Sequence, residues 1–294
     1  MTEPRRRRSA YRVEVLRTER LSASLVRVVV GGPGLAGFEP SPYSDSYVKV
    51  LFVHPDVPRP LPRTADGRVD VDGVTEALGR EHAPRMRSYT VRAFDAGELT
   101  LDFVVHGDAG LAGPWAAGAR PGDELLFMGP GGGYAPDPSA ARHLLVGDTS
   151  ALPAVAVALE RLPVDAVGHA VVEVYGAADR VALPAPAGVE VTWVHQAGGP
   201  PGVRLVEAVR ALPWTDDDLQ GFVHGEAGAV KELRRYLRLE RGMGLDRLSI
   251  SGYWRLGDDD EGWRAGKRAW NAAIEEAERY GGGSTGARSS TIAR

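Results

Sequence analysis

The chain has 294 residues, of which 43% are hydrophobic and 25% are charged, and its formal net charge is -4. These values are ordinary for a soluble globular protein of two domains, and they give no reason to expect nucleic-acid binding over the whole surface. There is no cysteine, which excludes disulfides, thiolate zinc sites, catalytic cysteines and cysteine-ligated iron–sulfur clusters. Any redox chemistry therefore needs a bound organic cofactor or an external metal.

Four consecutive arginines, Arg5 to Arg8, stand near the N-terminus. No apolar segment follows them, so we expect neither a secretory signal nor a twin-arginine export signal. We interpret residues 1–10 as a disordered basic tail rather than a nucleic-acid-binding arm. No run of about 18 apolar residues occurs, so we expect no membrane span. The sequence thus predicts a cytoplasmic monomer that binds neither nucleic acid nor membrane.

The first half of the chain is predicted to be β-structure. Short runs rich in β-branched and aromatic residues are separated by Gly, Pro and Asp. The predicted strands are 11–17, 25–31, 46–52, 88–94, 99–105 and 124–128. Six such strands favour a small antiparallel β-barrel over residues 11–135. The polar, proline-rich segment 55–84 predicts a long surface excursion.

The second half alternates strands with helices. The predicted strands are 142–146, 167–175, 189–194 and 221–224, and the predicted helices are 152–162, 203–211 and 230–241. This alternation favours a parallel sheet with right-handed crossovers in an α/β domain over residues 136–257. A glycine- and proline-rich joint precedes it. From residue 258 a charged helix is predicted to about residue 280, followed by a flexible tail.

One predicted strand carries groups suited to a flavin dinucleotide. Alternation places Arg87 and Tyr89 on one face and Ser88, Thr90 and Arg92 on the other. A guanidinium grips a diphosphate in bidentate fashion, a tyrosine ring lies against a flavin, and a threonine hydroxyl bonds to a ring nitrogen. Taken alone, this short motif also fits an ordinary barrel strand with exposed arginines.

A glycine-rich stretch begins at His106 and runs to Ala117. Small residues let backbone N–H groups approach a phosphate, and a helix near Trp115 adds its N-terminal dipole. The alternative is a glycine-rich turn that leads into a capping helix. A second glycine-rich stretch, residues 129–133, fits a phosphate cradle and an interdomain hinge equally well.

Two motifs follow strands of the predicted parallel sheet, where ligands bind in such folds. They are Gly147-Asp148-Thr149 and Gly225-Glu226-Ala227. The common dinucleotide fingerprint G-x-G-x-x-G is absent after the strand at residues 142–146. His143, His195 and His224 lack metal-ligand spacing, so we predict no metal site and interpret them as satisfied polar residues. The acidic runs 216–218 and 258–260 are interpreted as solvated caps or loops.

In this order and at these spacings, the motifs resemble the siderophore-interacting proteins, a branch of the ferredoxin-reductase-like flavoproteins. The resemblance covers about residues 11–261. The segments that carry it are 47–52, 87–90, 106–117, 121–123, 147–148, 151–154, 225–227 and 252–255.

The resemblance implies FAD bound by the barrel, NADH or NADPH as electron donor, and a ferric siderophore as acceptor. Tyr89 and Thr90 are expected to serve as catalytic residues beside the reacting edge of the flavin. The cofactor contacts implied are Arg87, Ser88, Tyr89, Thr90, Val104, His106, Gly110, Leu111, Ala112, Trp115, Ala116, Gly147, Asp148, Thr149, Gly225, Glu226, Tyr253 and Trp254.

The chain departs from the family pattern at two positions. Thr149 stands where the family has a glutamate, which removes a carboxylate beside the expected nicotinamide site. Leu111 stands where the family has a proline, and it keeps the N–H that proline lacks. Siderophore complexes are commonly anionic, and Lys49, Arg247 and Arg255 are the candidate cations that attract them.

Three other functions remain open on the sequence alone. The first is a general NAD(P)H:flavin oxidoreductase that serves another acceptor, such as a partner oxygenase. The second is an FAD-containing siderophore-binding protein without turnover, which the Thr149 departure keeps open. The third is a nucleic-acid binder that acts through the arginine tail.

Overall fold

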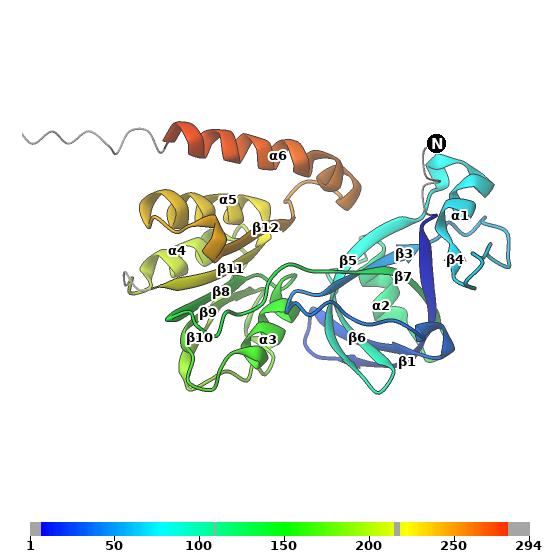
Figure 1. The fold of residues 1–294 in the computed structure, drawn as a ribbon, viewed down its shortest axis with the longest axis horizontal. Helices are drawn as coiled ribbons and strands as arrows, with labels where there is room; N and C mark the ends of the chain where they lie inside the picture. The colour runs from blue at the N-terminus through cyan, green and yellow to red at the C-terminus, as the bar shows by residue number, and fades with distance from the viewer. Residues whose placement is uncertain (1–6, 109, 215–217, 282–294) are drawn as a thin grey trace, which may run out of the picture.

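The computed structural model describes residues 7–108, 110–214 and 218–281. Two bodies lie side by side, a β-barrel and an α/β unit (Figure 1). The C-terminal helix α6 (Asp260–Gly281) lies across the α/β unit, and its first turn points toward the barrel (Figure 1). The predicted helix after residue 258 is therefore present, while the predicted tail beyond residue 281 lies outside the described residues.

Six strands form the barrel, and all of its pairings are antiparallel. They are β1 (Ser9–Arg20), β2 (Leu25–Gly31), β3 (Tyr47–Phe52), β5 (Arg85–Asp95), β6 (Glu98–Val104) and β7 (Glu124–Gly131). The order β2-β6-β5-β3-β7-β1 closes because β1 also pairs with β2. The predicted antiparallel barrel is confirmed.

Alternating apolar side chains fill the barrel. Val13 and Val15 of β1 point inward with Phe103 and Phe127, and all four are at most 2% exposed. The short helix α2 (Ala112–Gly118) closes one end of the barrel by burying Ala112 and Ala116 against this core. The barrel is therefore packed with side chains, as expected for so few strands.

Two predictions were wrong in part: the disordered tail over residues 1–10 and the surface excursion without helices over residues 55–84. Residues 1–6 lie outside the described residues, but Arg7 pairs with Asp70 and Arg8 with Asp72. Ser9 and Ala10 already pair with the short strand β4 (Val69–Asp70), so the ordered chain begins before the predicted boundary at residue 11. The arginines are ordered because acids at the start of α1 (Val71–Leu78) neutralise their charge. Helix α1 itself was not predicted, because the segment that contains it is polar and proline-rich.

The second unit is a five-stranded parallel sheet with the order β10-β9-β8-β11-β12. Its elements are β8 (Arg142–Gly147), α3 (Leu152–Arg161), β9 (Val167–Val174), β10 (Gly188–His195), α4 (Val203–Ala211), β11 (Leu219–Glu226), α5 (Ala227–Arg235) and β12 (Leu248–Trp254). The parallel α/β domain is therefore confirmed. Strand β12 was not among the predicted strands, because its serines and glycine weaken the β signal.

The two faces of this sheet carry separate apolar cores. Leu145 of β8 points to the α3 face, whereas Leu144 and Val146 point to the face covered by α4 and α5. Helix α6 covers α5 in turn, where Trp263 is buried and Arg234 pairs with Glu278 at 2.5 Å. Burial of both faces explains the nearly continuous apolar sequence of β8.

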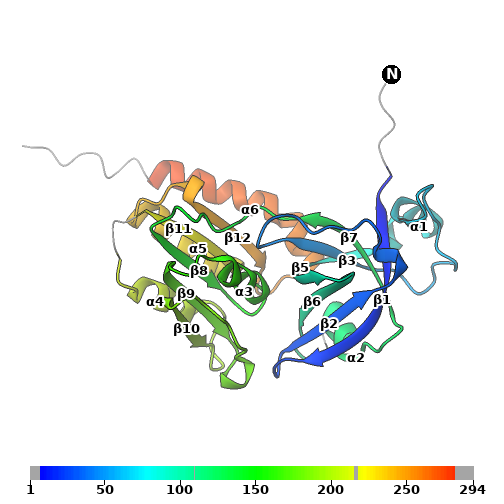
Figure 2. The same cartoon turned by 60° about the horizontal axis from the view of Figure 1, so that its bottom comes forward.

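The two units share a core at their junction. Leu25 of the barrel is 1% exposed and packs within the cluster that lies under α3. Beside it, Ser24 Oγ donates to Asp179 Oδ1 at 2.6 Å, and Arg92 of β5 pairs with Glu160 of α3 at 2.5 Å. Figure 2 shows the β1–β2 turn reaching toward the α/β unit at this point. Apolar contact supplies the attraction, and the polar contacts fix the orientation.

We predict that Asp179→Ala lowers the free energy of unfolding by about 1–3 kcal/mol, because it leaves the Ser24 hydroxyl and the Gly176 N–H unsatisfied at a buried junction. Urea unfolding of the full chain measures this. Asp165→Ala is the control, because Asp165 is exposed and its loss should change stability by less than about 0.5 kcal/mol. Equal stability of the two variants would contradict the prediction.

Candidate functional site at the domain junction

The carboxyl ends of β8, β11 and β12 meet around Asp148. Its Oδ1 accepts hydrogen bonds from Ser150 N at 2.8 Å and Ser150 Oγ at 2.5 Å, and its Oδ2 accepts from Glu226 N at 2.8 Å and Trp254 Nε1 at 2.7 Å. Burial raises the pKa of Asp148, and these hydrogen bonds oppose the rise. Both carboxylate oxygens are occupied, so the side chain holds Trp254 in place rather than offering itself to a ligand.

Gly225 makes this approach possible. Its φ is +146°, and a Cβ at this position would lie 2.7 Å from Asp148 Oδ2. Only glycine therefore allows β11 to turn so that Glu226 N reaches Asp148. Glu226 then caps α5, since its Oε2 accepts from Ala229 N at 2.9 Å. The predicted pair of strand-end motifs is thus brought together, as the parallel topology implies.

A second buried carboxyl lies close to Thr149. Thr149 Oγ1 donates to the Glu173 carbonyl at 3.5 Å, and Glu173 Oε2 accepts from Gly202 N at 2.7 Å. Glu173 Oε1 is buried and has no hydrogen-bond partner among the described residues. Burial raises the pKa of Glu173, and the neighbouring Asp148 raises it further. Strand β9 therefore carries a buried carboxyl on a residue whose main chain contacts Thr149.

Tyr253 connects the sheet to the barrel. Its ring centroid lies 4.9 Å from that of His224, and burial raises its pKa, with further increases from Asp45 and Tyr47 of the barrel. Tyr47 in turn pairs with Thr90 of β5, which is 8% exposed. Tyr253 of β12 is thus close enough to the barrel for Asp45 and Tyr47 to influence its pKa, and Tyr47 lies in register with Thr90 on the barrel side.

The glycine stretch at residues 129–133 supports this link by close packing. A Cβ on Gly131 would lie 2.3 Å from Cζ of Tyr47, so the Tyr47 ring rests on the backbone of β7. Gly133 N and Tyr134 N both donate to Asp45 Oδ1 at 2.8 Å. These contacts give the stretch a packing role beneath Tyr47.

Arg87 is held by the start of α6. Its guanidinium makes a bidentate pair with Glu261 at 2.6 and 3.0 Å and also contacts Asp260 at 3.0 Å. The side chain is only 15% exposed. The hydrogen bond from Arg87 lowers the pKa of Glu261, whereas burial raises that of Asp260. The interpretation of Asp260 as a solvated cap or loop residue is therefore wrong, and Glu261 was not singled out, because α6 begins more than 170 residues after Arg87.

Aromatic rings connect Tyr89 to the glycine-rich loop. The Tyr89 ring lies 4.1 Å from that of Phe103, and Phe103 lies 5.5 Å from Trp115 of α2 (centroid distances). Arg87 and Tyr89 share the barrel face of their register partners Val50 and Val48, as predicted.

The remaining predicted contacts lie around this loop. His106 and Gly110 are exposed, and residue 109 lies outside the described residues. Leu111 precedes α2, whose N-terminus has no side-chain cap. Val104 ends β6 and packs against the junction core. Ala112 and Ala116 face the barrel interior, so only their backbone is available to a ligand.

The three candidate cations occupy different places. Lys49 is half-buried on β3, in register with the exposed Ser88. Arg255 follows Trp254 and is 52% exposed, with Asp258 at 3.8 Å. Arg247 lies at the amino end of β12, away from the junction, and pairs with Asp137 and Asp218. The expectation that Arg247 binds substrate gains nothing from this placement, because the side chain lies at the opposite end of β12 from the junction.

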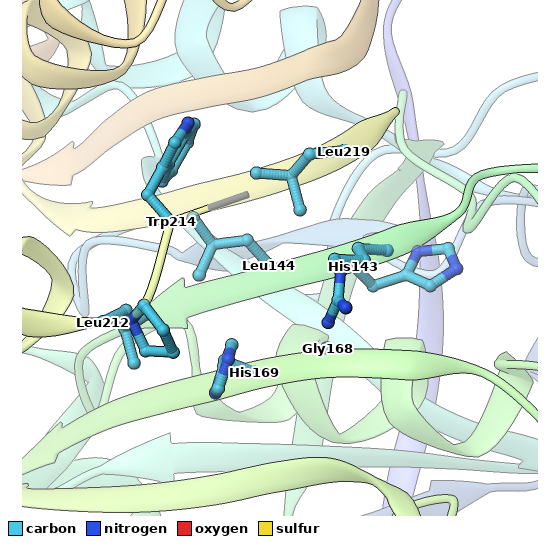
Figure 3. A pocket seen from close by; sticks show the side chains of 9 residues that line it. His143, Leu144, Gly168, His169, Leu212, Trp214 and Leu219 are labelled. Carbon is cyan, nitrogen blue, oxygen red and sulfur yellow. The ribbon is translucent and has the colours of Figure 1, made fainter. Parts of the chain in front are cut away.

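A small cavity of about 30 Å³ lies at the amino ends of β8, β9 and β11, lined by His143, His169 and Trp214 (Figure 3). It has room for a water molecule but faces away from the carboxyl ends where ligands bind. Within residues 7–108, 110–214 and 218–281, no group of three or more His, Asp or Glu side chains is arranged to hold a metal ion. None of the helices in the same ranges is long and apolar enough to cross a membrane.

A closed antiparallel barrel joined to a parallel α/β sheet is the ferredoxin-reductase-like fold. The sequence matches the Siderophore-interacting FAD-binding domain over residues 14–134 and Siderophore-interacting protein over residues 140–257. The structure of a siderophore utilization protein from T. fusca has a TM-score of 0.74 and 38% identity, covering 85% of this chain and 94% of that chain.

Relatives span nearly the same length. An uncharacterized protein of Mycobacterium tuberculosis is 45% identical over 92% of this chain and 98% of its own. Ferric vibriobactin reductase ViuB of Vibrio cholerae is 32% identical over 85% of this chain and 91% of its own. An NADPH-dependent ferric-chelate reductase of Escherichia coli is 32% identical over 82% and 91% respectively. The chain belongs to the siderophore-interacting protein family.

The pH dependence of stability should report on His224, which lies under Tyr253. Burial lowers the pKa of His224 to about 3. Below pH about 6.5 the unfolded chain therefore binds a proton that the native protein does not, so stability falls as the pH falls toward 3. Between pH 7.5 and 5.0 we predict that the free energy of unfolding drops by about 2 kcal/mol more in the wild type than in His224→Gln.

Urea unfolding at the two pH values measures this difference. Ser249→Ala is the matched control, because it removes the hydroxyl 3.0 Å from His224 Nε2 but keeps the imidazole. That variant should retain the wild-type pH dependence. Identical slopes in the wild type and His224→Gln would contradict a buried neutral His224.

Proposed function

We propose that the protein is an FAD-dependent reductase that takes electrons from a reduced nicotinamide dinucleotide and delivers them to a ferric siderophore. The observation that carries this proposal is the junction that packs the barrel, which bears Arg87, Tyr89 and Thr90 on β5, against the α/β unit whose parallel strands end around Asp148. The family's FAD-binding domain and the similarity to ViuB support it.

The side chains at the barrel edge fit a flavin dinucleotide. Arg87 offers a guanidinium fork for a diphosphate, and Tyr89 offers a half-buried ring. The loop before α2 offers backbone N–H groups, because no side chain caps that helix. Bound FAD supplies chemistry that the side chains lack, the conversion of a two-electron donor into one-electron transfer. We propose that Thr90 hydrogen-bonds the flavin ring and that Ser88 and His106 lie at the edge of its site.

On the other side of the junction, the chain orients the donor. Asp148 holds Trp254, and the ends of β8 and β11, including Gly147 and Thr149, form the edge of the crevice. Glu173 of β9 contributes a buried carboxyl to this side of the junction, and its Oε2 accepts from Gly202 N. The ring of Tyr253 packs against that of His224 on this side of the junction.

Lys49 and Arg255 are the proposed cations for an anionic iron complex. Siderophore oxygens are hard ligands that hold Fe(III), and a one-electron reduction to Fe(II) weakens that complex. Partly exposed positive charge near the junction raises the local concentration of an anionic substrate.

A second candidate is a flavoprotein that binds siderophores without turnover, which the substitution of Thr149 for a carboxylate favours. Anaerobic mixing of the FAD-loaded protein with NADH or NADPH separates the two. Bleaching of the flavin absorbance supports the reductase. Absorbance that stays unchanged with both donors supports the binding protein.

Arg87→Ala should weaken FAD binding by about one to two orders of magnitude, because a charge-assisted contact contributes about 1.5–3 kcal/mol. Titration of the apoprotein with FAD, followed by flavin fluorescence, measures the dissociation constant. Arg92→Ala is the matched control, since Arg92 pairs with Glu160 of α3 on the other side of the strand. Equal FAD affinity in the two variants would refute the assignment of Arg87.

Glu261→Gln completes this comparison. It removes the carboxylate that pairs with Arg87 while keeping a similar shape. The variant should bind FAD at least as tightly as the wild type, because Arg87 is released for the diphosphate. Weaker binding would show instead that Glu261 holds Arg87 in its cofactor-binding orientation.

The reductase itself is tested by trapping Fe(II) with a chromogenic chelator under anaerobic conditions. Photoreduced protein should release Fe(II) from ferric siderophores, and Lys49→Ala should raise the apparent KM for an anionic complex by up to about fivefold. Lys231→Ala, on the exposed side of α5, is the control and should leave that KM unchanged. Failure to produce Fe(II) from any of several hydroxamate and catecholate complexes would exclude the reductase function.

A further inference from the structure

A basic cluster lies at the carboxyl end of β9 and β10, on the half of the sheet farthest from β12. Arg180 follows β9, His195 is the last residue of β10, and Arg204 lies in the first turn of α4. Arg180 Nε donates to His195 Nε2 at 3.0 Å, and Arg204 NH1 donates to the His195 carbonyl at 3.4 Å. Both guanidinium groups therefore donate a hydrogen bond to the same residue, His195.

Two acids of this region are turned inward. Asp179, directly before Arg180, is 6% exposed and accepts hydrogen bonds from Ser24 Oγ at 2.6 Å and Gly176 N at 3.1 Å. Glu173, at the end of β9, is 3% exposed and accepts from Gly202 N. In the described part of the chain, no carboxylate oxygen lies within 4.0 Å of the guanidinium nitrogens of Arg180 or Arg204. Glu207, on the next turn of α4, is exposed but makes no ion pair with Arg204, so both guanidinium groups are exposed without a carboxylate partner among the described residues.

The position of this cluster on the sheet indicates which part of a bound dinucleotide it would contact. The strand order reverses between β8 and β11, and a dinucleotide on such a sheet lies across that switch point. The proposed flavin site, next to β12, takes the nicotinamide end. The adenosine end then lies toward β9 and β10. At this end, an acid that binds the ribose 2′-hydroxyl selects NADH, and an arginine accommodates the 2′-phosphate of NADPH.

We propose that Arg180 and Arg204 bind the 2′-phosphate of NADPH and make this the preferred electron donor. The proposal rests on the nicotinamide-dependent function proposed above and names the donor that this function uses. The acid that would favour NADH, Asp179, is already bound to the barrel. Arg180 donates to Nε2 of His195 through its Nε, which leaves the terminal N–H groups of Arg180 free for phosphate oxygens. His195 is thus a positioning residue.

The test uses the full-length, FAD-loaded protein and two measurements. Calorimetric titration compares adenosine 2′,5′-bisphosphate with adenosine 5′-monophosphate, and neither nucleotide can transfer electrons. Anaerobic stopped-flow mixing compares flavin reduction by NADPH and NADH. The variants are Arg180→Ala and Arg204→Ala, with Arg120→Ala, an exposed arginine of the barrel, as the control.

We expect the wild type to bind the 2′,5′-bisphosphate at least about tenfold more tightly than the monophosphate, and each site variant to lose most of that difference. The apparent KM for NADPH should rise by a similar factor in the variants, while that for NADH and the Arg120→Ala values stay within about twofold.

Equal affinity for the two nucleotides, or site variants that behave like the control, would overturn the proposal. If NADH reduces the flavin and NADPH has no advantage, the 2′-phosphate site is wrong and the reductase function stands. If neither donor reduces the flavin, the reductase proposal fails, and the nucleotide titration alone decides whether the phosphate site exists.

Discussion

The docking of the barrel on the α/β unit is the contact on which every part of the junction depends. Leu25 belongs to the barrel by sequence but is buried in the core under α3. Apolar burial is strong but has no preferred direction. The bond from Ser24 to Asp179 and the pair between Arg92 and Glu160 add direction, and they fix the register between the two units. Residues at the junction therefore keep their spacing although they come from distant parts of the chain.

Within the α/β unit, one buried carboxylate organises the ligand-binding edge. Asp148 receives hydrogen bonds from its own turn, from β11 and from the end of β12. Bonds to a charged acceptor are stronger than those to a neutral one, and leaving any of these donors unpaired in a buried place would be costly. Three strand ends are consequently held as one rigid edge, and the Trp254 ring is oriented as part of it.

The Arg87 guanidinium is a common partner for two kinds of anion, the carboxylates of α6 and the proposed flavin diphosphate. A largely buried charge has to be paired, and here the first turn of α6 supplies the carboxylates. The proposed flavin diphosphate offers the same geometry to the same fork. The docking of α6 and the binding of cofactor therefore involve a common side chain, which connects the C-terminal helix to the barrel. Arg180 differs from Arg87, because no carboxylate in the described part of the chain pairs with it. The adjacent acid, Asp179, instead accepts a hydrogen bond from Ser24 of the barrel.

The sequence by itself determined the class of fold and the general position of the site. Period-two patterns in the first half and alternating strands and helices in the second reflect local burial, so they were readable without tertiary information. The strand-end motifs at Gly147 and Gly225 were also predictable as neighbours, because parallel strands end at one edge of a sheet. Strand β12 and helix α1 escaped prediction, since glycine, serine and acidic residues hide short elements that tertiary packing stabilises.

Only the tertiary structure decided the partners of the charged residues. Nothing near Arg87 in the sequence indicates Glu261, and nothing near Arg247 indicates that two acids hold it at the wrong end of the sheet. The same holds for Glu173, which lies beside Thr149 only because β8 and β9 are paired. Charge pairing depends on which distant segments are brought within a few ångströms. That proximity is set by domain docking and strand order rather than by local pattern, which is why the elements were predictable and the electrostatics of the site were not.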